Sequence, residues 1–311
     1  MAGVTDWAFR SVCRELEPRI ATVTEMVSSK GLIFGDKKTE RLLRADGSPC
    51  GVQIFGGDPE TVARAAVLAL ERSGADFIDI NMGCPTPKIV RNGDGCALMK
   101  NPALCGAIVA AAARAVKAPV TVKIRSGWDR GSLNAAEVAA VCEQNGAAAV
   151  CVHGRTRVQQ YDGRADWDII AGVKAAVKIP VIANGDIRSA ETALRALSHT
   201  KADAVMVGRA ALGNPFVLAE ICAAIEGLPA PKPPVLEERA RWAGIQLERA
   251  LSDKGERPAV LEMRRHFCWY LHGLPRTQAL KREIIAMNTR HDAERVLEKW
   301  RSPRGRGGMK D

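Results

Sequence analysis

The side chain best suited to chemistry in this 311-residue sequence is a cysteine between a glycine and a proline. The segment Asn81-Met-Gly-Cys84-Pro85 follows a short apolar run and is predicted to leave a strand as a loop. A thiol on such a loop can donate a proton or act as a nucleophile, unlike cysteines packed within helices or strands. The alternative is that Cys84 is only a small residue in a turn.

Polar side chains interrupt or follow three other apolar runs. Gln53 lies inside one run, Lys123 stands within Thr-Val-Lys-Ile-Arg, and His153 follows Val-Cys-Val. A lysine inside a strand is costly unless it meets an anion or a hydrogen-bond acceptor. Each of the three residues could instead be a core polar group that its neighbours satisfy. Because all three approach carboxyl ends of strands, they favour a ligand ring that carries several carbonyl and nitrogen acceptors.

Two glycine-containing turns follow the last two predicted strands, at Asn184-Gly185-Asp186 and Gly208-Arg209. Glycine allows close approach of the backbone, and the N-terminus of the next helix offers free N–H groups to a phosphate. Asn-Gly-Asp alone is an ordinary turn, but the two turns side by side at a barrel mouth predict a phosphate site. Flavin mononucleotide (FMN) combines such a ring with a phosphate, so these residues favour FMN.

A series of seven β-rich runs, alternating with alanine-rich segments of helical length, must position these residues. The runs span residues 20–24, 51–55, 76–80, 119–124, 148–152, 180–183 and 203–207. Their apolar character predicts a parallel α/β sheet of the TIM (β/α)8-barrel type. That barrel needs eight strands, so we expect its first strand to precede Met1 and the barrel to show a gap or a stub there. An open doubly wound sheet is the alternative.

The organisation changes after residue 227. Residues 1–227 are predicted to form the barrel domain, 228–235 a proline-rich linker, 236–301 a helical bundle, and 302–311 a disordered basic tail. From residue 231 onward the chain has 18 Lys and Arg residues against 11 Asp and Glu residues, which is +7 of the total net charge of +10. This excess predicts either a solvated helical surface or a face that binds a polyanion.

The composition excludes several classes of protein. A hydrophobic fraction of 47% is too high for a disordered chain. No segment approaches the roughly 18 uninterrupted apolar residues of a membrane helix, and the first residues do not read as a signal peptide. Nine cysteines without a CxxC pair resemble neither a disulfide framework nor a zinc site. We therefore expect a cytoplasmic protein with reduced thiols, no metal, no membrane association and no obligate protein partner.

Seven motifs, in order along the chain, resemble the tRNA-dihydrouridine synthases, and the bacterial B-type subgroup most. They are Met1-Ala-Gly-Val-Thr-Asp6, Thr24-Glu-Met26, Asp79-Ile-Asn-Met-Gly-Cys-Pro85, Val122-Lys-Ile-Arg125, His153-Gly-Arg-Thr156, Ala183-Asn-Gly-Asp186 and Val207-Gly-Arg209. Each motif is weak alone, whereas seven in sequence are specific. The resemblance continues to about residue 300. The chain departs from the family in lacking the strand and Ala-Pro that usually precede Met-Ala-Gly, and in the variant Asn92-Gly-Asp-Gly-Cys96.

The resemblance implies an FMN-dependent enzyme that reduces the C5–C6 bond of specific uridines in tRNA to 5,6-dihydrouridine. NADPH would reduce the flavin, N5 of the reduced flavin would send a hydride to C6, and Cys84 would protonate C5. Asn81 and Arg125 would lie against the uracil edge. The implied FMN contacts are Met1, Ala2, Gln53, Lys123, His153, Asn184, Gly185, Asp186, Gly208 and Arg209.

The implied tRNA substrate has a physical requirement that the charge distribution can meet. A base inside a folded tRNA must be extruded at a cost of about a few kcal/mol, which phosphate contacts can offset. We expect Lys88 and Arg91, close to Cys84 in sequence, to contact the phosphates beside the extruded base. In the helical region we expect the same of Arg264, Arg265 and His266, with Trp269 and Tyr270 in the bundle core.

Two other functions stay open on the sequence. An FMN barrel could act on a free pyrimidine, although such enzymes lack the basic helical region. A barrel without activity could serve as a tRNA-binding protein, although the presence of Cys84, Lys123 and His153 argues against that.

Overall fold

Two compact units make up the computed structural model, which describes residues 1–275 and 277–301. Unit 1 consists of Met1–Asp6 and Ile20–Gly208. Unit 2 consists of Trp7–Arg19 and the chain from Arg209 onward, so a helix near the start of the sequence packs with the C-terminal helices. The predicted tail 302–311 lies outside the described residues.

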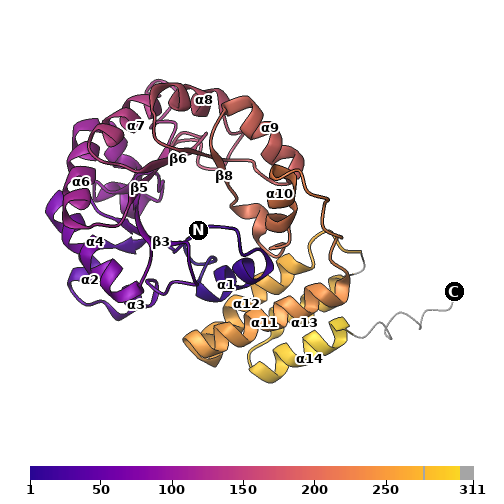
Figure 1. Ribbon diagram of the computed structural model, residues 1–311. Coiled ribbons are helices and arrows are strands. Elements are labelled where there is room, and N and C mark those ends of the chain that lie inside the picture. Colours follow the sequence, from indigo (N-terminus) through magenta and orange to yellow (C-terminus); the bar gives the residue numbers. More distant parts are fainter. Residues whose placement is uncertain (276, 302–311) are drawn as a thin grey trace. The chain divides into compact units, whose positions relative to one another are not determined.

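A parallel sheet forms the centre of unit 1, with helices around it (Figure 1). Its strands follow one another in the order β1 (Thr22–Val23), β3 (Cys50–Phe55), β4 (Phe77–Asn81), β5 (Val120–Arg125), β6 (Ala149–His153), β7 (Val181–Asn184) and β8 (Ala204–Met206). Each of these overlaps one predicted run. The short strand β2 (Val27–Ser28), which was not predicted, also pairs with β3. Among the described residues β1 and β8 do not pair, which is the predicted gap in a TIM-type barrel.

Three helices of unit 1 begin at side chains that cap the free N–H groups of the first turn. Asp58 accepts a hydrogen bond from the N–H of Thr61 at 2.8 Å, Asn101 accepts one from Leu104 at 3.1 Å, and Ser189 forms a capping box with Thr192. Asp, Asn and Ser are residue types that favour helix N-caps, so the sequence alone indicates these three start sites. The helices are α2 (Ser29–Ile33), α3 (Lys37–Arg41), α4 (Pro59–Ser73), α5 (Pro87–Arg91), α6 (Pro102–Ala115), α7 (Ala135–Gln144), α8 (Trp167–Ala176) and α9 (Ala190–Thr200), with a 3-10 helix at Gly95–Lys100.

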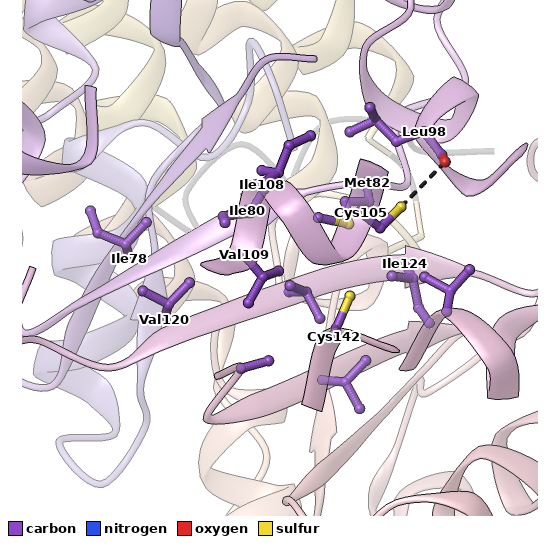
Figure 2. Close-up of a cluster of buried hydrophobic side chains, with 14 of the residues drawn as sticks. Ile78, Ile80, Met82, Leu98, Cys105, Ile108, Val109, Val120, Ile124 and Cys142 are labelled. Carbon is purple, nitrogen blue, oxygen red and sulfur yellow. Dashed lines mark hydrogen bonds between the residues drawn. The ribbon is translucent and has the colours of Figure 1, made fainter. Parts of the chain in front are cut away.

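The strands of unit 1 have one aliphatic face and one polar face. Aliphatic side chains such as Ile78, Ile80 and Val120 pack with Ile108 and Val109 of α6 in the buried core (Figure 2). Because side chains alternate along a strand, every second residue lies on the opposite face. That inner face carries the polar side chains, so the prediction of uniformly apolar strands was too simple.

Unit 2 is a bundle of helices. Its members are α1 (Trp7–Leu16), α10 (Val217–Ile225), α11 (Leu236–Lys254), α12 (Glu256–Tyr270), α13 (Gln278–Ala286) and α14 (Arg290–Arg301), with a 3-10 helix at Arg209–Ala211. Phe267 and Tyr270 are fully buried, and the Tyr270 hydroxyl donates to Gln246 Oε1 at 3.1 Å. Helix α12 accommodates Pro258 because this proline lies in its first turn, where the missing N–H is not needed.

None of the helices within the described residues is both long and apolar enough to cross a membrane.

Candidate active site

Three polar side chains on the inner face of β3 and β4 form a hydrogen-bonded chain. Gln53 lies directly across from Asp79, and its Nε2 donates to Asp79 Oδ2 at 2.6 Å. Asn81, two residues further along β4, donates from Nδ2 to Gln53 Oε1 at 2.8 Å. The other Asp79 oxygen accepts from Thr121 Oγ1 at 2.6 Å. Burial raises the Asp79 pKa, and the bonds from Thr121 and Gln53 oppose that rise.

The Cys84 loop is attached to this chain through Asn81. Asn81 Oδ1 accepts hydrogen bonds from the backbone N–H groups of Gly83 at 3.1 Å and Cys84 at 2.8 Å. Gly83 packs closely against β5, because a Cβ there would lie 3.3 Å from the Ile124 carbonyl carbon, a tight contact that favours glycine. The Cys84 side chain is partly exposed, and its sulfur lies 3.3 Å from Thr86 Oγ1. The thiol therefore lies on the loop that follows β4, as the sequence predicted, and its reactivity stays a prediction.

Lys123 carries an ammonium group on the same inner face. It lies across from Asn81 on β4 and from Cys151 on β6. Burial lowers the Lys123 pKa, and interactions with Cys151 and Asp79 oppose that change. Within the described part of the chain its ammonium makes no hydrogen bond or ion pair. A partly buried cation of this kind favours a ligand that brings an acceptor.

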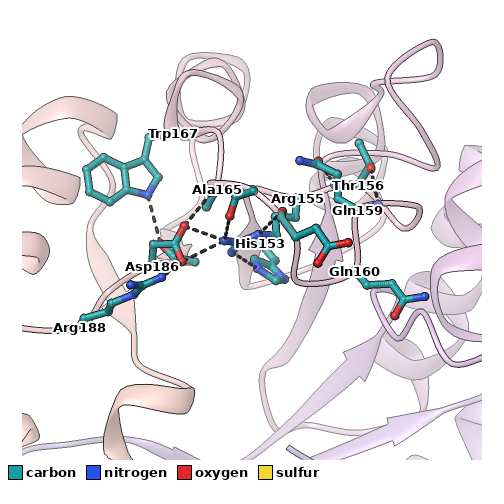
Figure 3. A network of polar contacts seen from close by, with 12 residues as sticks. His153, Arg155, Thr156, Gln159, Gln160, Ala165, Trp167, Asp186 and Arg188 are labelled. Atoms are coloured by element: carbon teal, nitrogen blue, oxygen red, sulfur yellow. Dashed lines mark hydrogen bonds and ion pairs between the residues drawn. The ribbon is translucent and has the colours of Figure 1, made fainter. Parts of the chain in front are cut away.

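His153, at the end of β6, belongs to a second polar network (Figure 3). The Arg155 side chain is only 1% exposed, and its Nη1 lies 3.3 Å from His153 Nε2. Because a guanidinium can only donate, Nε2 accepts and the proton of the neutral ring lies on Nδ1. Arg155 Nη2 also donates to both Asp186 oxygens at 3.0 and 2.8 Å and to the Gly163 carbonyl at 2.7 Å.

The turn after β7 is shaped by its own hydrogen bonds. Burial raises the Asp186 pKa, but bonds from the Ala165 N–H, Arg155 and Arg188 outweigh it and lower the pKa to about 2. Gly185 has a φ of 116°, and a Cβ there would lie 2.6 Å from the Ala165 Cβ. Asn184 Nδ2 donates to the Met206 carbonyl at 2.9 Å. The side chains of Asn184 and Asp186 are thus engaged within the protein.

Some of the predicted FMN contacts at the start and the end of unit 1 lie close to one another. The N-terminal segment is held by Glu25, whose Oε1 accepts from the N–H groups of Val4 and Thr5 at 2.9 and 3.0 Å. A Cβ on Gly208 would lie 3.7 Å from the Met1 sulfur, which brings Met1 and its neighbour Ala2 near the end of β8. Arg209 is the first residue of the C-terminal part of unit 2.

Arg125 connects the Cys84 loop to the loop after β6. Its Nε donates to the Gly83 carbonyl at 2.8 Å, and its Nη1 donates to the carbonyls of Thr156 and Gln160 at 2.9 and 2.8 Å. Its side chain is 3% exposed, and burial lowers its pKa. Arg125 therefore positions backbone on both sides of the site.

Sequence reasoning missed three residues of this site. Arg155 lies within a quoted motif but was given no role. Asp79 precedes Asn81 by two residues, so the alternation of side chains along a strand would have found it. Tyr161, 54% exposed, has its ring 6.5 Å from the His153 ring and 5.9 Å from the Arg125 guanidinium. The position of Tyr161 in a loop that follows a strand could have marked it as a candidate site residue.

The predicted RNA contacts differ in exposure. Lys88 and Arg91 are exposed on α5, which follows the Cys84 loop. In unit 2, Arg265 is exposed, whereas Arg264 donates from Nε to the Met287 carbonyl at 2.7 Å. His266 is 3% exposed, and its ring lies 5.7 Å from the Phe9 ring and 5.1 Å from the Trp269 ring.

Comparison with known proteins places a family model and individual relatives in agreement on one protein family. Residues 1–302 match the family described as Dihydrouridine synthase (Dus). A "Probable tRNA-dihydrouridine synthase" of Mycobacterium tuberculosis is 41% identical over 311 residues, covering 96% of this chain and 80% of the relative. The "tRNA-dihydrouridine synthase B" of Pseudomonas aeruginosa is 44% identical over 283 residues, covering 88% of this chain and 83% of the relative.

Proposed function

The chain belongs to the dihydrouridine synthase family, and we propose that it reduces specific uridines of tRNA to 5,6-dihydrouridine, using FMN and NADPH. The single observation that carries the proposal is the position of Cys84. Its thiol is partly exposed on a loop that Asn81 ties to the strand edge where Lys123 and His153 also lie. The cytoplasm, where tRNA is modified, is the proposed location.

FMN fits the groups that the inner face presents. Gln53 Nε2 has one N–H left after its bond to Asp79, and Lys123 has an ammonium without an acceptor among the residues that the structure describes. These donors suit the carbonyl and nitrogen acceptors of an isoalloxazine ring, with His153 beside it. When bound and reduced by NADPH, FMN would supply the hydride that N5 sends to C6 of the uridine.

The phosphate of FMN would lie against backbone. Gly185 packs closely against Ala165, whereas a Cβ on Gly208 would meet only the Met1 sulfur, at 3.7 Å. Gly208 therefore allows close approach of a phosphate to the backbone, with Met1 and Ala2 nearby. The Asp186 carboxylate would repel a phosphate, so we assign Asp186 to holding the turn, together with Asn184. Arg209 supplies a cation next to Gly208 in the chain.

Cys84 would complete the reduction by delivering a proton to C5. The Gly83 and Cys84 N–H groups donate to Asn81 Oδ1 and so hold the cysteine backbone. The thiol therefore needs little rearrangement to meet a base that binds beside this loop. Arg125 holds the Gly83 carbonyl on the other side of the same loop, and Asn81 offers an N–H to the uracil edge.

The tRNA would be held by exposed cations. Lys88, Arg91 and Arg265 are exposed and suited to phosphate contacts. We leave Arg264 and His266 out of the proposed surface, because the guanidinium of Arg264 is bonded to the Met287 carbonyl and the His266 ring is buried. The helical region 236–301 remains the proposed tRNA-holding domain, with residues 1–227 as the catalytic domain.

The test is dihydrouridine formation by purified protein with FMN, NADPH and tRNA that lacks the modification, read by mass spectrometry of nucleosides. Cys84→Ala should bind FMN and allow NADPH to reduce it, while dihydrouridine formation falls by about 10² to 10⁴. Cys268→Ala, a partly exposed cysteine in unit 2, is the matched control and should keep full activity. Equal rates for the two variants would remove Cys84 from the mechanism, and no product with the unsubstituted protein would refute the function.

A further inference from the structure

A continuous line of hydrogen bonds leads from the Cys84 loop to a buried carboxylate. The bonds join Cys84 N–H to Asn81, Asn81 to Gln53, and Gln53 to Asp79, at 2.8, 2.8 and 2.6 Å. We infer that Asp79 is a positioning residue that holds the Cys84 loop in place by acting through Gln53 and Asn81. The inference rests on the proposed function for its meaning in catalysis, but the geometry stands without it.

The orientation of both amides depends on the two ends of the line. At one end, Asn81 Oδ1 accepts from two backbone N–H groups, so its Nδ2 must face Gln53. The facing atom of Gln53 must then be the acceptor Oε1, which turns Nε2 toward Asp79. At the other end, both Asp79 oxygens accept hydrogen bonds, from Gln53 Nε2 and Thr121 Oγ1, which fits only this orientation of Gln53. Every bond therefore runs in one direction toward Asp79.

Burial makes this arrangement strong. Asp79 is 3% exposed and Asn81 is 8% exposed, so water does not compete for their bonds. Aligned hydrogen bonds in a low-dielectric interior polarise one another, so the bond to Asp79 strengthens the bonds that precede it. Without that acceptor, Gln53 could rotate and withdraw Oε1 from Asn81. The amide that holds the Cys84 backbone would then lose its own support.

Strand register explains why Asp79 can act at a distance. Gln53 lies across from Asp79, and Asn81 lies two residues further along β4 on the same face. The line therefore crosses from β4 to β3 and back to β4, and it ends at the loop that leaves β4. Asp79 lies deeper along the strand than the Cys84 loop, so we assign it no contact with substrate.

The test measures the alkylation rate of Cys84 by iodoacetamide, without FMN or tRNA. Trypsin places Cys84 alone in the peptide 73–88 and Cys96 alone in the peptide 92–100. Asp79→Val removes both acceptors and suits a strand. It should raise the Cys84 rate about tenfold, as expected for the loss of a buried hydrogen bond. Asp79→Asn keeps one acceptor oxygen and should give a smaller rise.

Two controls separate positioning from general stability. Thr121→Val removes the other bond to Asp79 but leaves the line intact, so Cys84 should react at the unsubstituted rate. Cys96 is fully buried and should stay protected in every variant. If Asp79→Val also exposes Cys96, Asp79→Asn decides: a rise confined to Cys84 supports the inference, whereas no rise, or a rise shared with Cys96, overturns it.

Kinetics distinguish this inference from the proposed function. If the chain forms dihydrouridine, Asp79→Asn should lower kcat and leave KM for tRNA unchanged, because Cys84 is displaced while the tRNA surface is intact. Absence of dihydrouridine with the unsubstituted protein would refute the function alone, since the alkylation assay needs no turnover. A normal Cys84 alkylation rate in both Asp79 variants would refute the positioning role alone.

Discussion

Replacing Arg155 by methionine tests the polar network beneath the candidate site. Methionine keeps most of the side-chain volume but cannot hydrogen bond to Asp186, Gly163 or His153. Removing one partner of a buried ion pair costs about 3–5 kcal/mol, and Asp186 keeps its bonds from Ala165 and Arg188. We therefore expect Arg155→Met to lower the free energy of unfolding by about 3 kcal/mol, the low end of that range.

The pH dependence of this loss in the free energy of unfolding provides a second test. The folded-state pKa of Asp186 is about 2, below its ordinary 3.8, so its ionisation stabilises the fold above pH 4 and loses that effect as the pH falls toward 2. The shift corresponds to at most about 2 kcal/mol. Arg155 supplies part of it, so the stability difference between the unsubstituted protein and Arg155→Met should shrink between pH 7 and pH 3.

Equilibrium urea denaturation followed by circular dichroism measures both quantities. The matched control is Arg188→Met, because Arg188 donates to the same carboxylate but its side chain is 68% exposed. An exposed pair of this kind contributes less than about 1 kcal/mol. Equal losses for the two variants, or a loss for Arg155→Met below about 1 kcal/mol at pH 7, would refute the assignment of Arg155 as the centre of the network.

The remaining predictions concern binding. Lys123→Met should weaken FMN binding about tenfold or more, because the ligand loses its charged donor, and quenching of flavin fluorescence measures the affinity. The control is Lys178→Met, because Lys178 is exposed. Equal FMN affinities for the two variants would contradict the assignment of Lys123 as an FMN contact. Lys88→Ala and Arg91→Ala should each weaken tRNA binding and lower the slope of log affinity against log salt by about 1 in filter-binding assays. A salt slope that neither variant changes would place the phosphate contacts elsewhere.

Local features of this protein were accessible from the sequence. The start sites at Asp58, Asn101 and Ser189 depend on hydrogen bonds to residues three positions ahead, so they can be read without the fold. The strands could be found because each is a short run of apolar residues between turn signals. Cys84 could be assigned to a loop because glycine and proline flank it.

The partners of the polar residues were decided by tertiary structure. Gln53 meets Asp79 because β3 and β4 pair in one register, and a shift by one residue would separate them. Arg155 meets Asp186 across 31 residues of sequence, through the pairing of β6 with β7. Arg264 was predicted to face RNA, yet its guanidinium is bonded to a carbonyl 23 residues away. Charge and position along the chain indicate that a side chain needs a partner, but only the packing of distant segments determines which partner it finds.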